Sequence, residues 1–160
     1  YLDTEDGRTP LVGIDLARGE GKGLGKSQLD DIVGRVVERG ARALLFFSLA
    51  EKKTVNYLKD TYGNRIILIE QDDLLASAAL LESCQALIAC NTDLLHLAVS
   101  LQVPVVGIFA EKSERWIAVD NNSVRIVQVQ NPRSANIAQI VEGLDLALRD
   151  RHQQTGAEGR

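Results

Sequence analysis

The stretch from Gln85 to Phe109, QALIACNTDLLHLAVSLQVPVVGIF, decides the fold class of this chain. Within it, the apolar run 86–90 ends at the polar turn 91–93, and a segment with helical spacing, 94–101, follows. A second apolar run, 105–109, begins directly after a proline. Two fully apolar strands joined by a helix are typical of a parallel sheet that is covered on both faces. The stretch therefore predicts strand, tight turn, helix and strand within one parallel sheet.

The same alternation of apolar runs and helical patterns continues on both sides of this stretch. The predicted strands are 11–16, 43–47, 65–69, 86–90, 105–109 and 124–129, and the predicted helices are 28–39, 51–62, 74–84, 94–101 and 135–148. Six strands that alternate with five helices predict a doubly wound, Rossmann-like α/β sheet. We expect one domain over residues 11–150, a linker over 1–10 and a flexible tail over 151–160.

Composition narrows the classes of protein to which the chain can belong. It has 160 residues, 45% of them hydrophobic, which suits one domain with a real core and excludes disordered and fibrous classes. With a net charge of −4 and no basic stripe, we expect no nucleic-acid partner. The apolar runs are too short to span a bilayer, so we expect no transmembrane segment.

Two further observations concern the compartment and the origin of the chain. Cys84 and Cys90 lack the spacing of a metal site and are read as buried thiols in a reducing, cytoplasmic compartment. The sequence begins at Tyr1 and contains no methionine, from which we expect a chain cut from a longer protein.

A polar cluster, Asn91, Thr92, Asp93 and His96, follows the central predicted strand. Doubly wound sheets bind their ligands at this place, between a strand's carboxyl end and the start of the next helix. Asn91 or Thr92 can cap the helix and Asp93 suits its first turn, so a capping role alone also accounts for these residues. No second histidine is near His96 in sequence, which argues against a metal site or a Ser-His-Asp triad.

Two other strand ends carry candidate ligand groups. The Gly-rich loop 17–27 could bind an anion, which Lys22 or Lys26 would neutralise, although its glycine spacing is off by one from that of a nucleotide-phosphate loop. Glu51 follows the second strand, where an acid often accepts hydrogen bonds from ribose hydroxyls. The alternatives are a solvated loop and an acid that complements the dipole of a helix start.

The residues 91–101, NTDLLHLAVSL, followed by Pro104 and Phe109-Ala110, resemble a motif of the family 9 glycosyltransferases, the lipopolysaccharide heptosyltransferases. That motif reads roughly Asp-Thr/Ser-Gly-x-x-His-Leu-x-Ala-Ala-Leu, then Pro, an apolar strand and Phe-Gly. The preceding LLASAALLESCQALIAC is also similar to the family, and Trp116 stands where the family often has an aromatic residue. The resemblance covers residues 11–130. It implies one half of a GT-B enzyme, the C-terminal domain that binds a nucleoside-diphosphate sugar.

The resemblance also assigns roles to individual positions outside the turn. Lys26 matches the lysine that reaches the donor phosphates, and Glu51 matches the acid on the ribose. Asp72 falls in the stretch that lines the base pocket. After Lys26 the family usually has an aromatic residue and a proline, whereas this chain has Ser27 and Gln28.

Within the turn, Asn91 matches an acid that contacts the donor sugar, and Thr92, Asp93, Leu94 and His96 match the phosphate-facing residues. Two of these positions depart from the family. Asn91 keeps an acceptor but loses the charge. Asp93 replaces a glycine, and its carboxylate would face the diphosphate at a cost on the order of 1 to 4 kcal/mol at about 4 Å.

The resemblance implies inverting sugar transfer by direct displacement, from a nucleotide sugar to a glycan or lipid acceptor. No cofactor and no metal are expected. The acceptor site and the general base are expected in an N-terminal domain, so this chain alone should not catalyse transfer, and the acceptor could bring peripheral contact with the inner membrane. The alternative is a degenerate binding or assembly module that has lost the donor, with a phosphate-binding NTPase as a weaker third reading.

Overall fold

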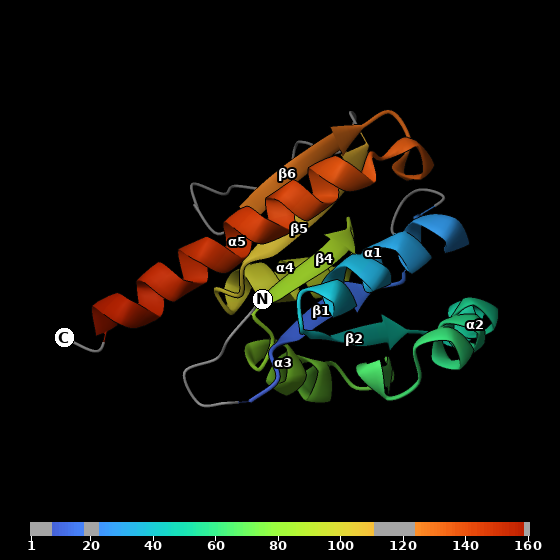
Figure 1. Cartoon of the computed structure of the whole chain (residues 1–160), viewed down its shortest axis with the longest axis horizontal. Helices are drawn as coiled ribbons and strands as arrows, with labels where there is room; N and C mark the ends of the chain where they lie inside the picture. Colours follow the sequence, from blue (N-terminus) through green and yellow to red (C-terminus); the bar gives the residue numbers. More distant parts are fainter. Residues whose placement is uncertain (1–7, 18–22, 111–123, 159–160) are drawn as a thin grey trace.

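The computed structural model describes residues 8–17, 23–110 and 124–158 of the chain (Figure 1). The strands are β1 (Leu11–Asp15), β2 (Arg42–Phe47), β3 (Ile66–Glu70), β4 (Ala86–Cys90), β5 (Val105–Ala110) and β6 (Val124–Val129). The helices are α1 (Lys26–Glu38), α2 (Lys52–Tyr62), α3 (Leu74–Glu82), α4 (Asp93–Ser100) and α5 (Ile137–Glu158), with short 3-10 helices at Leu49–Glu51, Gly63–Arg65 and Pro132–Ser134. The described elements alternate between strand and helix, as predicted, up to β5.

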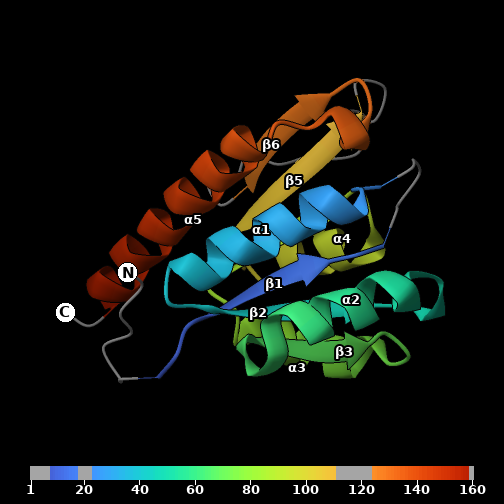
Figure 2. The same ribbon diagram turned by 45° about the vertical axis from the view of Figure 1, so that its right-hand side comes forward.

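The six strands form one parallel sheet in the order β3-β2-β1-β4-β5-β6, which confirms the predicted doubly wound fold. In β1, Ile14 lies beside Leu45 of β2 on one side and beside Ile88 of β4 on the other. The winding direction reverses at this point, so β1 and β4 flank the topological switch of the sheet. Their carboxyl ends lie at the same edge because the strands are parallel, and the arrowheads of β1 and β6 point toward that edge in Figure 2.

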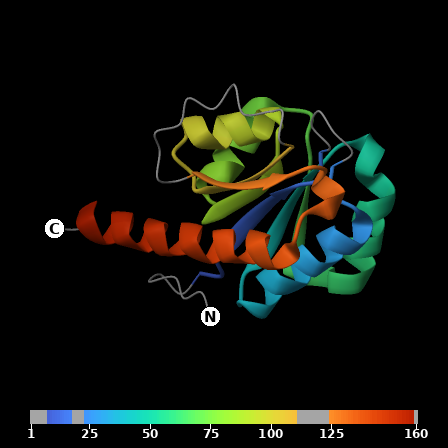
Figure 3. The same cartoon turned by 90° about the horizontal axis from the view of Figure 1, so that it is seen from above.

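Side chains of successive strand residues point to opposite faces of the sheet and build two separate cores. Val12 and Ile14 of β1 belong to the core under α1, α2 and α5, whereas Leu44 and Phe46 of β2 belong to the core under α3 and α4. The two groups of helices lie on opposite sides of the sheet when the molecule is seen from above (Figure 3). This double cover is the reason why the strands read as uninterrupted apolar runs.

The strands lie where they were predicted, to within a residue or so at each end, and β4 and β6 match the prediction. The prediction for the end of the last helix was wrong. This helix was expected to end at Leu148, but α5 continues to Glu158. Two contacts with distant parts of the fold hold the later turns of α5 in place. Arg125 of β6 pairs with Asp150, and the Arg151 guanidinium donates to the carbonyl oxygen of Glu82 at 3.4 Å. A helix that is already formed and packed is readily extended by residues such as Arg and Gln, which have good helix propensity.

Helix α4 ends at Ser100, one residue before the predicted end, and Gln102 just after it takes the left-handed conformation with φ at 58°. The N–H of Val103 donates to the carbonyl of Ala98 at 3.0 Å, and the N–H of Gln102 donates to that of Val99 at 3.1 Å. This pair of bonds closes the helix and turns the chain into β5. Within residues 8–17, 23–110 and 124–158, no helix is both long and apolar enough to cross a membrane.

Candidate functional site

A cavity of about 420 Å³ lies at the carboxyl edge of the sheet, where the start of α4 meets the ends of β1 and β3. Its lining residues are Ala17, Gln71, Asn91, Thr92, Asp93, Leu94 and His96. The structure therefore brings together all the residues predicted from the turn and the first helical turn after β4. The cavity also lies next to the topological switch, where doubly wound sheets hold their ligands.

Thr92 is the N-cap of α4, and its backbone is extended, with φ at −132° and ψ at 166°. The Thr92 hydroxyl oxygen accepts from the N–H of Leu95, and the Thr92 carbonyl accepts from the N–H of His96, both at 3.4 Å. The N–H groups of Asp93 and Leu94 have no hydrogen-bond partner among the described residues. A helix start with unsatisfied N–H groups and the positive end of the dipole is suited to an anion.

A buried carboxylate, Asp15 at the end of β1, lies beneath this turn and was missed in the sequence. Only 2% of the residue is exposed. The Thr92 hydroxyl donates to Oδ2 of Asp15 at 2.6 Å, the N–H of Ala17 donates to Oδ1 at 3.0 Å, and the Gln71 amide donates to Oδ1 at 3.4 Å. Asp15 thereby joins the ends of β1, β3 and β4. The signal that could have revealed it was an acid closing the apolar strand LVGID.

Burial raises the pKa of Asp15 from 3.8 to about 6, because the charged form loses its hydration. The hydrogen bonds from Thr92, Ala17 and Gln71 act in the opposite direction, and the carboxylate of Glu51 raises the pKa slightly further. The charge beneath the helix start therefore changes close to neutral pH. A carboxyl group that titrates in this range and lies at a cavity is typical of functional sites.

Asn91 and His96 form the rim of the cavity. The Nε2 atom of His96 lies 3.3 Å from the Oδ1 atom of Asn91, which directly precedes the N-cap of the helix. His96 is exposed and Asn91 is half-buried. With the amide and the ring held together, a ligand at the helix start would meet a polar pair beside the N–H groups.

Glu51 caps a helix start in this structure. Its Oε2 accepts from the N–H of Ser48 at 2.7 Å and from the Ser48 hydroxyl at 2.6 Å. These bonds fix the start of the 3-10 helix that precedes α2, at the kind of helix start where an acid that complements the dipole was the alternative considered. The residue does not line the cavity, although its charge acts on Asp15. Its predicted contact with a ribose stays a prediction.

Lys26 begins α1 and is turned toward α2. Its Nζ atom lies 3.8 Å from the centroid of the Tyr57 ring, a cation–π contact. Asp30, one turn further along α1, accepts from the hydroxyl of Tyr57 at 3.4 Å and from that of Tyr62 at 2.8 Å. Lys26 does not line the cavity in this conformation. Lys22 lies outside the described residues, as does Trp116.

Asp72 is exposed and lies in the turn between β3 and α3. The neighbouring Asp73 caps α3, since its Oδ1 accepts from the N–H of Leu75 at 2.9 Å. Asp72 does not line the cavity, whereas Gln71 does. The stretch predicted to line a base pocket therefore reaches the cavity through Gln71, one residue earlier.

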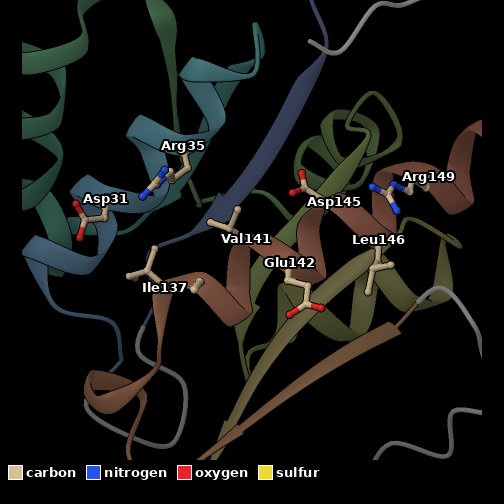
Figure 4. Close-up of a pocket in the computed structure, with 9 residues that line it drawn as sticks. Asp31, Arg35, Ile137, Val141, Glu142, Asp145, Leu146 and Arg149 are labelled. Atoms are coloured by element: carbon tan, nitrogen blue, oxygen red, sulfur yellow. The ribbon is translucent and has the colours of Figure 1, made fainter.

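A second cavity, of about 530 Å³, lies between α1 and α5 (Figure 4). Asp31 and Arg35 come from α1, and Glu142, Asp145 and Arg149 come from α5. Its walls mix both signs of charge with apolar side chains, and none of the predicted site residues lies there. The cavity at the start of α4 is the one that the predicted residues share.

Comparison with known proteins gives the family of the chain. The sequence model of glycosyltransferase family 9 (heptosyltransferase) matches residues 11–142. No curated protein sequence matches. Similar solved structures include the Escherichia coli ADP-heptose lipopolysaccharide heptosyltransferase II, with a TM-score of 0.77 and 16% identity over 90% of this chain and 48% of that one.

Two more structures are similar. A family 9 glycosyltransferase from Veillonella parvula has a TM-score of 0.76 and 12% identity over 89% of this chain and 47% of that one. The E. coli heptosyltransferase WaaC with ADP has a TM-score of 0.66 and 16% identity over 88% and 46%, respectively. The chain thus spans about half the length of the structures it matches. Because the family model matches most of this chain, the chain belongs to glycosyltransferase family 9.

Proposed function

We propose that this chain is the C-terminal, donor-binding domain of a family 9 glycosyltransferase and holds the diphosphate of a nucleoside-diphosphate sugar at the start of α4. The proposal is carried by the N–H groups of Asp93 and Leu94, two residues of the cavity wall, for which the described part of the chain offers no hydrogen-bond partner. Backbone N–H groups at a helix start bind phosphate oxygens without any need for a basic side chain. The family and the position at the topological switch support the same assignment.

The similar structures suggest the first ligands to test. One is named for ADP-heptose and another contains ADP. In this chain, Gln71 and Asn91 would flank the donor, and Lys26 would approach the phosphates after leaving the Tyr57 ring. Glu51 would accept from the ribose and Asp72 would lie toward the base, as the resemblance implies.

The proposed reaction is inverting displacement. An acceptor hydroxyl oxygen attacks the anomeric carbon from the face opposite the diphosphate, a base removes its proton, and the bond from that carbon to the diphosphate oxygen breaks. The role of this chain is to stabilise the negative charge that grows on the leaving diphosphate. The base and the acceptor site would lie in an N-terminal partner domain, and the reaction would take place in the cytoplasm, with peripheral contact to the inner membrane through the acceptor. No metal is required in this scheme.

One observation favours a second function, a binding or assembly module that no longer holds a donor. Asp93 is an exposed carboxylate at the helix start, and Asp15 lies beneath it. Both charges oppose a diphosphate. The two functions differ in whether the N–H groups of α4 are used by a ligand.

The test is calorimetric titration of ADP, UDP, GDP and ADP-glucose into the wild-type chain and into two variants of Asp93, the first helical residue. Asp93→Ala removes the charge and keeps the N–H, so donor affinity should rise by about tenfold. Asp93→Pro removes the charge and the N–H together. Proline suits the first helical position, and the extended Thr92 before it is compatible with proline, so the fold should be kept.

If the helix start holds the diphosphate, Asp93→Pro should bind at least about tenfold more weakly than Asp93→Ala, because a hydrogen bond to a charged group is lost. Equal affinities for the two variants would remove the helix start from the binding site. Binding of none of these ligands at millimolar concentration by any of the proteins would favour the module.

A further inference from the structure

The hydrogen bond between Thr92 and Asp15 has a fixed direction when Asp15 is ionised. A carboxylate is only an acceptor, so the Thr92 hydroxyl must donate its single proton to Oδ2 across the 2.6 Å contact. One lone pair of the hydroxyl oxygen faces the N–H of Leu95. Toward the cavity, Thr92 then offers no proton, and its oxygen repels a phosphate oxygen.

The contacts of Asp15 also decide which oxygen can carry a proton. Oδ1 faces two donors, the N–H of Ala17 and the amide of Gln71, and therefore has to stay an acceptor. Among the residues that the structure describes, Oδ2 has only the Thr92 hydroxyl as a hydrogen-bond partner, and a hydroxyl can accept as well as donate. A proton on Oδ2 would point at the Thr92 oxygen and reverse the hydrogen bond. The hydroxyl proton is then free to rotate into the cavity.

We propose that Asp15 is a positioning residue that couples diphosphate binding to the uptake of one proton: with Oδ2 protonated, the Thr92 hydroxyl donates to a diphosphate oxygen at the start of α4. The proton comes from solvent, and no heavy atom has to move. Taking up this proton also removes a buried negative charge from beneath the ligand. The coupling rests on the proposed function, because it requires that a diphosphate occupies the cavity.

Other titratable groups face this part of the sheet edge, and the experiment has to separate their effects on binding from that of Asp15. They are Glu51 after β2, Cys90 at the end of β4, and Asp93 and His96 on α4. Burial raises the pKa of Cys90 to about 12, so the thiol stays neutral near pH 7. The pKa of Asp15, raised to about 6 by burial, places its protonation within reach of neutral conditions. His96 lines the same cavity and needs its own variant.

The probe is ADP-glucose, whose diphosphate ester has no ionisation near neutral pH, unlike the terminal phosphate of ADP. Its dissociation constant and the number of protons taken up are measured by calorimetry in buffers of different ionisation enthalpy. For the wild-type chain we expect binding on the order of tenfold tighter at about pH 5.5 than at about pH 7.5, with uptake of about one proton at the higher pH.

Asp15→Asn mimics the protonated state. Its amide nitrogen can replace Oδ2 and donate to Thr92, while its amide oxygen replaces Oδ1 and accepts from Ala17. We expect it to bind tightly at both pH values without proton uptake. Thr92→Ser keeps the hydroxyl and should keep the pH dependence, whereas Thr92→Val should lose most of it. Comparison of these two variants separates the hydrogen bond of the Thr92 hydroxyl from the direct repulsion between the Asp15 charge and the ligand.

Each remaining outcome counts for or against the coupling. Persistence of the pH dependence in His96→Gln supports Asp15 as its source, and its loss there assigns the effect to His96 and overturns the proposal. Equal wild-type affinity at both pH values, with binding by Asp15→Asn, overturns the proton coupling and leaves the donor-binding function standing. Absence of binding by both the wild-type chain and Asp15→Asn at both pH values overturns the coupling together with the donor-binding function. Binding by wild type with none by Asp15→Asn overturns the coupling alone.

Discussion

The starts of α4 and α1 occupy equivalent places in the fold, yet their polar groups are used differently. Each helix follows a strand at the carboxyl edge, β4 and β1, respectively. At α4, the Thr92 side chain caps the helix, and Thr92, Asp93 and Leu94 all line the cavity. At α1, the N–H of Gly25 donates to the Gln28 side chain at 2.8 Å, and the Gln28 amide donates to the carbonyls of Arg133 and Ala135.

This difference shows that a strand, a loop and a helix start do not by themselves make a ligand site. The start of α1 is joined to the segment between β6 and α5, so its side-chain hydrogen bonds serve the fold. The start of α4 rests on a buried carboxylate whose three donors come from separate segments of the chain. Under the proposed function, the anion would therefore lie at the start of α4, and Lys26 of α1 would have to leave the Tyr57 ring to reach it.

The largest expected effect concerns the cost of the buried charge at Asp15. Its folded-state pKa is raised from 3.8 to about 6, so the folded chain holds a proton that the unfolded chain has already lost between these values. The free energy of unfolding therefore falls as pH rises through this range. The loss amounts to about 3 kcal/mol by neutral pH, at about 1.4 kcal/mol for each pKa unit.

Asp15→Asn should remove this contribution, so its stability relative to wild type should rise by about 2 kcal/mol between about pH 4 and about pH 7. Urea unfolding at several pH values measures the difference. Asp72→Asn is the matched control, since it removes one carboxylate from an exposed turn at the same edge. If the free energy of unfolding depends on pH in the same way for wild type and Asp15→Asn, then burial does not destabilise the ionised Asp15 carboxylate. The contrast between the two helix starts would then weaken.

The sequence predicted those parts of the fold and site that depend on local pattern. The apolar runs identified the strands because both faces of the sheet are covered. Thr92 was one of two residues expected to cap α4, because a cap bonds within three residues of itself. Features that depend on distant partners were missed. Asp15 meets Thr92 77 positions later, and α5 is extended where Asp150 meets Arg125 of β6.

An intermediate effect is expected at the start of α1. Gln28→Ala removes the acceptor of the Gly25 N–H and the two bonds to the segment before α5, which should cost about 1 kcal/mol of stability. Gln28→Glu keeps the acceptor and loses the donors, so it should cost less at the helix start and still loosen that segment. Thermal unfolding ranks the two variants, and ADP-glucose affinity should stay at the wild-type value in both. A change in affinity with unchanged stability would make the start of α1 part of the ligand site.

The smallest effect concerns Lys26 and the ring that holds it. Tyr57→Leu removes the ring, and loss of one exposed cation–π contact should cost about 0.5 kcal/mol of stability. If Lys26 leaves the ring to reach a diphosphate, that same contact opposes binding in the wild-type chain. Its removal should then tighten ADP-glucose binding by about twofold, and Tyr57→Phe, which keeps a ring, should bind like wild type.

A double-mutant cycle separates this explanation from an indirect effect of the substitution on α2. Lys26→Ala should weaken ADP-glucose binding, and adding Tyr57→Leu to it should change affinity no further, because the cation that the ring held is gone. Equal gains from Tyr57→Leu with and without Lys26 would mean that the ring acts on the ligand by another route. Lys26 would then belong to the structural start of α1, and the diphosphate site would consist of α4 alone.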